Sequence, residues 1–300
     1  PNPALIRSMG DKIEARRTMK ALGLDPIPGT DEPLRSLEEA RSAAEGIGYP
    51  VLLKAASGGG GRGMRRVFQA DGLESAFEEA STEALSSFGD DRLYMEKLIE
   101  AGRHIEFQVL GDHYGRVCVL GERECSIQRR HQKLLEESPS PVVTSEQRER
   151  FSRTISSVLS KAGYTSAGTV EMLRAPSGEL YFMELNTRLQ VEHPVTELTT
   201  GVDLVEWQLR IAANEPLPAH FPTPSGHAME LRINAEDPSR NFVPTPGRLT
   251  SFSFPEAAEV RVDTHLAAGD EVSPHYDSMI AKLIVSGPSR EVVIERLEAA

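Results

Sequence analysis

The chain has few cysteines and no long apolar run, and each absence excludes a class of protein. Its 300 residues include only Cys118 and Cys125, too few for a disulfide framework or a cysteine-based zinc site. No run of about 18 apolar residues occurs, so no transmembrane helix is predicted. No charged segment followed by an apolar one opens the chain, as it would in a secretory signal. These absences favour a globular protein of a reducing compartment.

Basic residues are also scarce relative to acidic ones. The chain has 33 Lys and Arg against 45 Asp and Glu, a net charge of −12, which argues against nonspecific nucleic-acid binding. A length of 300 residues suits one large domain or two to three small ones. Pro1 leads straight into a helical pattern, and residues 295–300 stop inside another helix. We therefore expect the chain to be a fragment of a longer protein.

Residues 181–194 are the stretch around which the other motifs are arranged. Tyr181, Met183 and Leu185 share one parity, and the other parity carries Phe182, Glu184, Asn186, Arg188, Gln190 and Glu192. In an extended strand, residues two apart share a face and lie about 7 Å apart. The pattern predicts an apolar face on a core and a second face whose groups bind a cation, bind an anion or move a proton. An amphipathic strand that runs into a loop is the alternative.

Four consecutive glycines follow a predicted buried strand at residues 49–56. They belong to the segment 57–64, Ser-Gly-Gly-Gly-Gly-Arg-Gly-Met. Free backbone N–H groups and positive φ angles suit such a loop to wrapping phosphates. It is neither a Walker A loop, because no Gly-Lys-Ser/Thr closes it, nor a dinucleotide fingerprint. A linker is the alternative, but the flanking Lys54, Arg62, Arg65 and Arg66 favour a glycine-rich flap between two strands.

Two glutamates are expected to meet across a hairpin. If its turn is centred near Ser177-Gly178, then Glu171 lies opposite Glu184, and like charges in that position are destabilising. A bound divalent cation removes this penalty, and hard oxygen ligands suit Mg²⁺ or Mn²⁺. Asn186 adds a third oxygen on the face of Glu184. The alternative is that one carboxylate points to solvent.

Residues 124–133 form the densest polar cluster, in which Arg129, Arg130, His131 and Lys133 indicate an anion pocket rather than a nucleic-acid patch.

Helices are predicted at 11–23, 37–47, 73–85, 145–162 and 204–213, and residues 226–286 are predicted to be mostly β. A lysine beside a glycine-rich flap, a paired-carboxylate cation site and a cationic cluster together indicate use of a nucleoside triphosphate.

The chain resembles the biotin carboxylase component of biotin-dependent carboxylases such as acetyl-CoA or propionyl-CoA carboxylase, an ATP-grasp enzyme. The resemblance runs from end to end. It is carried by Met9-Gly-Asp-Lys12, Lys54 with residues 57–64, Glu96-Lys97, Arg103-His104, residues 126–133, Glu171, residues 183–197, residues 231–237 and Tyr276-Asp-Ser-Met279.

The resemblance implies an α+β ATP-grasp fold, two α+β lobes that clasp ATP, followed by a mostly β C-terminal region. The implied division is a helical linker at 1–25, a lid lobe with the flap at 26–98, a catalytic lobe at 99–220 and a truncated biotin carboxylase C-terminal region at 226–300. The resemblance also implies that the chain is a fragment, which lacks the N-terminal α/β domain that family members carry.

The family also implies roles for individual residues. ATP would contact Lys12, Lys54, Gly60, Gly61, Glu96, Lys97, Leu98, Ile99, His104, Gln128, His131 and Glu171. The metal would be held by Glu171, Glu184 and Asn186, and bicarbonate by Lys133, Arg188, Gln190 and Val191. Lys133, Arg188, Glu192 and Arg232 would be the catalytic residues. Glu192 would deprotonate bicarbonate so that carboxyphosphate forms, and Arg232 would stabilise the biotin enolate that takes up CO₂.

The implied cofactors are ATP, Mg²⁺ or Mn²⁺, and carrier-bound biotin. The implied partners are a biotin carboxyl carrier, a carboxyltransferase and a second copy of the full-length chain, without nucleic acid or membrane. The expected location is the cytoplasm, with the mitochondrial matrix or plastid as alternatives. Two rival interpretations are another ATP-grasp ligase, such as a carbamoyl phosphate synthetase or a purine-pathway carboxylase, and a non-catalytic ATP-binding homologue.

Overall fold

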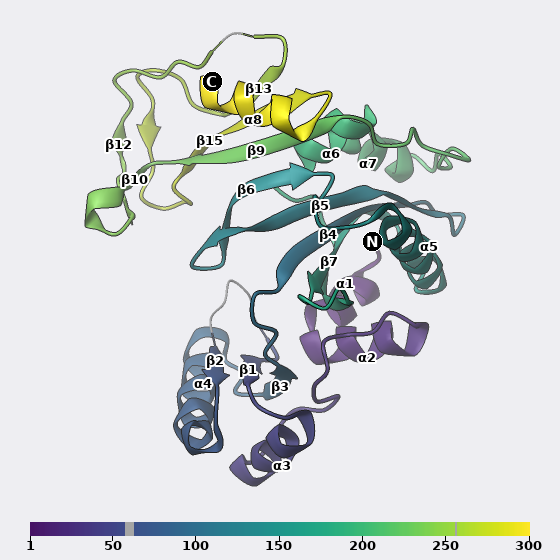
Figure 1. Cartoon of the computed structure of the whole chain (residues 1–300), viewed down its shortest axis with the longest axis vertical. Helices are drawn as coiled ribbons and strands as arrows, with labels where there is room; N and C mark the ends of the chain where they lie inside the picture. Colours follow the sequence, from purple (N-terminus) through teal and green to yellow (C-terminus); the bar gives the residue numbers. More distant parts are fainter. Residues whose placement is uncertain (58–62, 256) are drawn as a thin grey trace.

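A computed structural model describes residues 1–57, 63–255 and 257–300. The helices are α1 (Pro3–Gly10), α2 (Lys12–Leu22), α3 (Leu37–Ile47), α4 (Leu73–Phe88), α5 (Ser145–Lys161), α6 (His193–Thr200), α7 (Leu204–Ala212) and α8 (Arg290–Ala299). Figure 1 shows a small unit with β1, β2, β3, α3 and α4 at one end of the molecule and a long curved sheet above it. The fold is α+β, as predicted.

The small unit is built on a three-stranded antiparallel sheet, which we call the lid sheet. Its strands are β1 (Val51–Ala55), β2 (Met64–Val67) and β3 (Leu93–Lys97), with β1 in the middle. Val51 and Leu53 of β1 pack with apolar residues of α3 and α4. The pairing of β1 with β2 confirms that the glycine-rich segment joins two strands. Gly60 and Gly61, which were assigned to the flap, lie outside the described residues.

The second sheet has the order β13-β15-β9-β6-β5-β4-β7-β8, and its neighbouring strands are antiparallel. Its strands are β4 (Arg103–Gly111), β5 (Val117–Arg129), β6 (Gln132–Ser138), β7 (Ser166–Arg174), β8 (Leu180–Asn186), β9 (His227–Asn234), β13 (Val260–Asp263) and β15 (Met279–Gly287). The shorter strands are β10 (Glu236–Asp237), β11 (Val243–Pro244), β12 (Gly247–Arg248) and β14 (Glu271–Val272). Because β6 pairs with β9, the segments 99–220 and 226–300 share one sheet.

Alternation along β4 divides the two faces of this sheet. Ile105 and Phe107 are buried in a core that includes residues of α1, α2 and α5. His104, Glu106 and Gln108 have the other parity, so they point to the opposite face. One face of β4 is therefore a conventional apolar core, whereas the other carries buried polar groups.

The hairpin of β7 and β8 confirms one register and corrects another prediction. Glu171 is the partner of Glu184, as predicted from the turn. The next pair is Met172 with Phe182, which leaves Met183 as an extra residue in a bulge. The bulge reverses the expected parity: Phe182 is fully buried in the core, and Met183 faces the candidate site.

The polar face of this stretch also ends earlier than expected. β8 stops at Asn186, and α6 begins at His193 with Glu192 as its N-cap residue. Arg188, Gln190 and Glu192 therefore lie in a loop and at a helix start rather than at successive strand positions. No helix in the described part of the chain combines the length and the apolar character needed to cross a membrane.

Candidate active site

A cavity of about 670 Å³ contains most of the residues predicted to be functional. It is lined by Lys12, Lys54, Met64, His104, Gln128, Arg130, His131, Gln132, Lys133, Glu171, Met183, Glu184, Asn186, Arg188, Gln190, Val191, Glu192, Arg232 and Asp277. A hollow of similar volume, about 710 Å³, lies near Phe252 and Val260, and the described residues around it carry no charge. Of these two cavities, the first is lined by charged side chains and is therefore the candidate active site.

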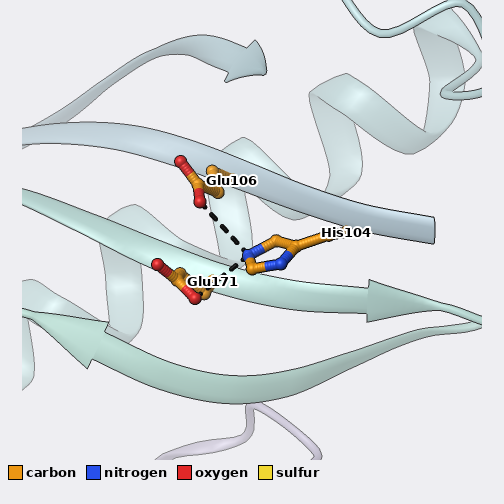
Figure 2. Close-up of side chains that lie close together, drawn as sticks. All are labelled: His104, Glu106 and Glu171. Carbon is orange, nitrogen blue, oxygen red and sulfur yellow. Dashed lines mark ion pairs between the residues drawn. The ribbon is translucent and has the colours of Figure 1, made fainter. Parts of the chain in front are cut away.

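His104 lies between two carboxylates on adjacent strands (Figure 2). Its Nε2 atom is 3.1 Å from Glu106 Oε1 and 3.0 Å from Glu171 Oε2. Burial alone would lower the pKa of His104, but Glu171 and Glu106 outweigh it and raise this pKa to about 10. The imidazole is thus a cation at neutral pH and holds β4 and β7 carboxylates together.

Lys133 joins the same carboxylates to Glu192. Its Nζ donates to Glu192 Oε1 at 2.6 Å, to Glu171 Oε1 at 3.2 Å and to Glu106. Burial disfavours the ammonium form, but Glu106, Glu171 and Glu192 raise the pKa of Lys133 far above its ordinary value. This lysine is therefore a permanent cation at the meeting point of three buried acidic side chains.

The predicted metal ligands converge at the end of the β7–β8 hairpin. Asn186 Nδ2 donates to Glu171 Oε1 at 2.9 Å and to Glu184 Oε1 at 3.4 Å, and Lys12 Nζ is 3.5 Å from Glu184 Oε2. The side chain of Glu184 is 36% exposed and faces the cavity. In this arrangement the amide N–H group of Asn186 faces both carboxylates. The two carboxylates and, with the carboxamide turned over, the oxygen of Asn186 are the hard donors that suit a divalent cation such as Mg²⁺ or Mn²⁺.

Gln190 and Arg123 connect this wall to the protein interior. Gln190 Nε2 donates to Glu171 Oε1 at 2.9 Å, and its Oε1 accepts from Arg123 at 3.4 Å. Arg123 is fully buried and also donates to Gln108 at 2.8 Å, and to Thr196, Thr169 and Glu106. Since an arginine only donates, the amide oxygen of Gln190 faces Arg123, and its amide N–H group is directed to Glu171.

Glu192 is 2% exposed and lies between two cations. Arg232 donates to Glu192 Oε2 at 2.9 Å, on the side opposite the contact of Lys133 with Oε1. Val191 lines the cavity, and its carbonyl accepts a hydrogen bond from Lys282 at 2.8 Å. Arg188 is exposed at the cavity and donates to the Leu189 carbonyl at 3.3 Å.

The lid side supplies Lys54, whose Nζ donates to Glu96 Oε2 at 2.9 Å. Glu96 is 1% exposed, is also paired with Arg16, and does not line the cavity. Lys97 donates to the carbonyls of Gly48 and Tyr49, each at 2.8 Å. Leu98 and Ile99 follow β3 and are likewise absent from the cavity wall, so these four residues are not gathered with the others.

Two predicted nucleotide residues lie on the β5–β6 hairpin. Gln128 Nε2 is 3.0 Å from His104 Nδ1, and it donates to the Cys125 carbonyl at 2.7 Å. His131 has a positive φ of 67° at the hairpin tip and lines the cavity. The tip thereby brings both side chains to the wall that carries His104.

Sequence reasoning missed Glu106 and Arg123 as members of the site. Glu106 shares its strand parity with His104, and that period of two was a signal that could have identified it. Arg123 gave no local signal, because its partners come from segments 15 to 73 residues away.

Two family models match the chain. The model described as "Carbamoyl-phosphate synthase L chain, ATP binding domain" covers residues 11–220, and the model "Biotin carboxylase C-terminal domain" covers residues 230–300. Among curated relatives, the biotin carboxylase of Nostoc sp. is 49% identical over the whole chain, which spans 68% of that protein. A pyruvate carboxylase subunit of Methanothermobacter thermautotrophicus is also 49% identical, and the chain spans 61% of it.

Solved structures agree with these relatives. The biotin carboxylase domain of the Hydrogenobacter thermophilus 2-oxoglutarate carboxylase, a dimer in complex with MgADP, ADP and bicarbonate, has a TM-score of 0.96 and 48% identity. The alignment covers 99% of this chain and 66% of that one. The biotin carboxylase of Campylobacter jejuni has the same TM-score at 44% identity. With an ATP-binding domain followed by the biotin carboxylase C-terminal domain, and with matches near half identity over the whole of this chain, the chain belongs to the biotin carboxylase family.

Proposed function

We propose that the protein carboxylates biotin with bicarbonate and ATP through carboxyphosphate, the first half-reaction of a biotin-dependent carboxylase and a ligase activity. The observation that carries the proposal is Glu192, buried between Lys133 and Arg232 in the cavity that also holds the Glu171–Glu184 pair. The complex of the related 2-oxoglutarate carboxylase domain with MgADP and bicarbonate supports the choice of substrates.

Lys12 and Lys54 supply positive charge for the ATP phosphates at the two sides of the cavity. Glu171, Glu184 and Asn186 hold Mg²⁺ or Mn²⁺, which when bound neutralises phosphate charge. His104 and Lys133 keep Glu171 in position from the sheet side. The remaining nucleotide assignments, including Glu96 to Ile99 along the adenine and Gly60 and Gly61 in the flap, are part of the same proposal.

Bicarbonate is placed by Lys133, Arg188, Gln190 and Val191, and Glu192 removes its proton. A bicarbonate oxygen then bonds to the γ-phosphorus as the bond from that phosphorus to ADP breaks. Carboxyphosphate decomposes to CO₂ and phosphate beside biotin. The released phosphate takes the proton from N1 of biotin, Arg232 stabilises the negative charge of the resulting enolate, and N1 then bonds to CO₂. A positioned base such as Glu192 commonly accelerates this kind of step by about 10² to 10⁴.

The proposed partners follow from the half-reaction. Biotin arrives on a carboxyl carrier protein or domain, and a carboxyltransferase protein or domain passes the carboxyl group to the final acceptor. We also propose a homodimer for the full-length protein, in line with the dimer of the related domain, and a cytoplasmic location, with a plastid or mitochondrial matrix as alternatives.

The full-length protein tests this proposal directly. ATP cleavage should require bicarbonate and should be stimulated by free biotin, with carboxybiotin as a product. Glu192→Gln should lower biotin carboxylation by about 10² to 10⁴, whereas the exposed Glu298→Gln should not. ATP cleavage that needs ammonia or a purine intermediate in place of biotin would identify a different ligase. Wild-type carboxylation by Glu192→Gln would show that the assigned base is wrong.

A further inference from the structure

Behind Arg232, two glutamates face one another in the interior of the large sheet. Glu136 on β6 and Glu230 on β9 are direct cross-strand partners. Both side chains have an exposed fraction of 0%. Directly opposed residues of antiparallel strands have side chains on the same face at close range, where two negative charges repel. Arg232 is two residues beyond Glu230, so it shares that face.

The hydrogen bonds of this pair are incomplete. Glu136 Oε1 accepts from Arg232, at 2.7 Å from Nε and 2.6 Å from a terminal nitrogen. Glu136 Oε2 and both carboxyl oxygens of Glu230 are buried and have no hydrogen-bond donor in the described part of the chain. Lys282 Nζ is 4.0 Å from Glu230 Oε2, too far for a hydrogen bond, and it donates to the Val191 carbonyl instead.

Among the described residues, Arg232 is the only charged group that is hydrogen-bonded to the pair. The surrounding groups are Arg232 and Glu192, Lys282 with Asp263, and Glu106 and Cys125 from neighbouring strands. Lys133, Arg123 and His104 lie with Glu106, Glu171 and Glu192 instead. One proton on the pair supplies a donor between an oxygen of Glu230 and Glu136 Oε2, and it removes one of the two facing negative charges.

We propose that Glu136 and Glu230 share one proton and that this carboxyl pair positions Arg232. The acid form of Glu230 donates to Glu136 Oε2, which leaves Glu136 Oε1 to hold Arg232 at two nitrogens. The pair then carries one negative charge rather than two, so Arg232 keeps net attraction for an anionic substrate. Burial raises the pKa of Glu136 to about 7 and that of Glu230 well above its ordinary value, in agreement with this arrangement. The assignment of an anionic substrate to Arg232 rests on the proposed function.

Infrared difference spectroscopy on the full-length protein tests the shared proton without reference to activity. At pH 7 the wild type should show the C=O stretching band of a protonated carboxyl group, and Glu230→Gln should lose it while remaining folded by circular dichroism. The exposed Glu298→Gln is the matched control and should retain the band. A wild-type spectrum without the band, or a band that survives in Glu230→Gln, would overturn the inference and would leave the proposed function unaffected.

Steady-state kinetics test separately whether the carboxyl pair positions Arg232. Glu136→Gln should lower kcat/KM for biotin by about 10- to 100-fold with little change in KM for ATP, because only the orientation of Arg232 is disturbed. Glu230→Gln, whose amide donates permanently, should lower kcat/KM at pH 7 less than Glu136→Gln does, and should lose less of it at alkaline pH than the wild type. Identical pH profiles for the wild type and Glu230→Gln would contradict the role even if the infrared band were present.

Discussion

Lys54 is buried and Lys133 is mostly buried in the wall of one cavity, and their surroundings differ. Lys54, on the lid sheet, contacts Glu96, and Arg16 binds the same carboxylate. The carboxylate of Glu96 is thus paired with two cations. Lys133, on the large sheet, contacts three carboxylates, those of Glu106, Glu171 and Glu192. In both cases burial lowers the pKa and the carboxylate partners more than restore it, so both lysines are charged.

The difference indicates two uses of a buried ammonium group. Around Lys54, two cations and one carboxylate leave a net positive charge, which suits an anionic ligand such as a phosphate chain. Around Lys133 the ammonium holds acidic groups that would otherwise repel one another, including the proposed base and a proposed metal ligand. Removing Lys133 should therefore disrupt the protein itself, whereas removing Lys54 should mainly affect the ligand.

The largest effect is expected for Lys133→Met. Because three buried carboxylates lose a common cation, the free energy of unfolding should fall by about 3–5 kcal/mol. Bicarbonate-dependent ATP cleavage should be lost as well. Urea unfolding of the full-length protein measures the first quantity. Lys161→Met, at the exposed end of α5, is the control and should change stability by less than about 0.5 kcal/mol. Wild-type stability for Lys133→Met would mean that water or protonation compensates these carboxylates.

Glu184→Gln tests the proposed metal site without removing a carboxylate that contacts Lys133. Losing one of the two opposed carboxylates should raise the Mn²⁺ concentration needed for half-maximal ATP cleavage by about tenfold or more. Without metal, stability should stay the same or rise by up to about 1 kcal/mol, because a like-charge cross-strand pair is removed. Glu179→Gln, an exposed residue of the same hairpin, should change neither quantity. An unchanged Mn²⁺ requirement in Glu184→Gln would refute the cation site.

Some features of this site could be predicted from the sequence alone, and others could not. The register that opposes Glu171 to Glu184 was predictable, because a short turn at Ser177-Gly178 determines which residues of a hairpin meet. The bulge at Met183 was not, because a strict period of two assigns every residue of a strand to a face in advance. Phe182 was therefore placed on the polar face although it is buried in the core.

Long-range pairing was the other missing information. The chain shows Glu136, Glu230 and Arg232 as ordinary members of two strands, and only the pairing of β6 with β9 makes them neighbours. Arg123 similarly acquires its role from partners on several other elements. Resemblance to a family supplied the proposed ligands, but not the buried groups that hold those ligands in place.

Lys54→Met should have a smaller effect on stability than Lys133→Met. Arg16 still compensates Glu96, so we expect a loss of about 1–2 kcal/mol, below the usual cost of breaking a buried ion pair. KM for ATP should rise by about tenfold, the equivalent of one charged contact. Urea unfolding and initial rates at varied ATP measure the two effects. If Lys54→Met destabilised the protein as much as Lys133→Met, the two lysines would not differ in the way proposed.

Asp112→Asn has a small expected effect and tests whether backbone donors can hold a buried carboxylate that has no hydrogen bond from a cationic side chain. Asp112 accepts from the backbone N–H groups of Leu217, Arg116 and Tyr114, each at 2.9 Å. Burial alone would raise the pKa of Asp112, but these backbone donors, with a smaller contribution from the charge of Arg116, hold it below its ordinary value. The amide should cost about 1 kcal/mol at neutral pH, measured by urea unfolding.

The pH dependence of that cost has a definite sign. Because the folded pKa of Asp112 is below the unfolded value of about 4, its stabilising contribution is present above that value. The contribution is lost as the pH falls through the folded pKa, so the wild type and Asp112→Asn should converge in acid. Asp91→Asn, at an exposed site, should show no such convergence. A difference that grew toward acid would mean that the backbone donors do not favour the charged form, and that buried carboxylates in this protein depend on cations such as Lys133.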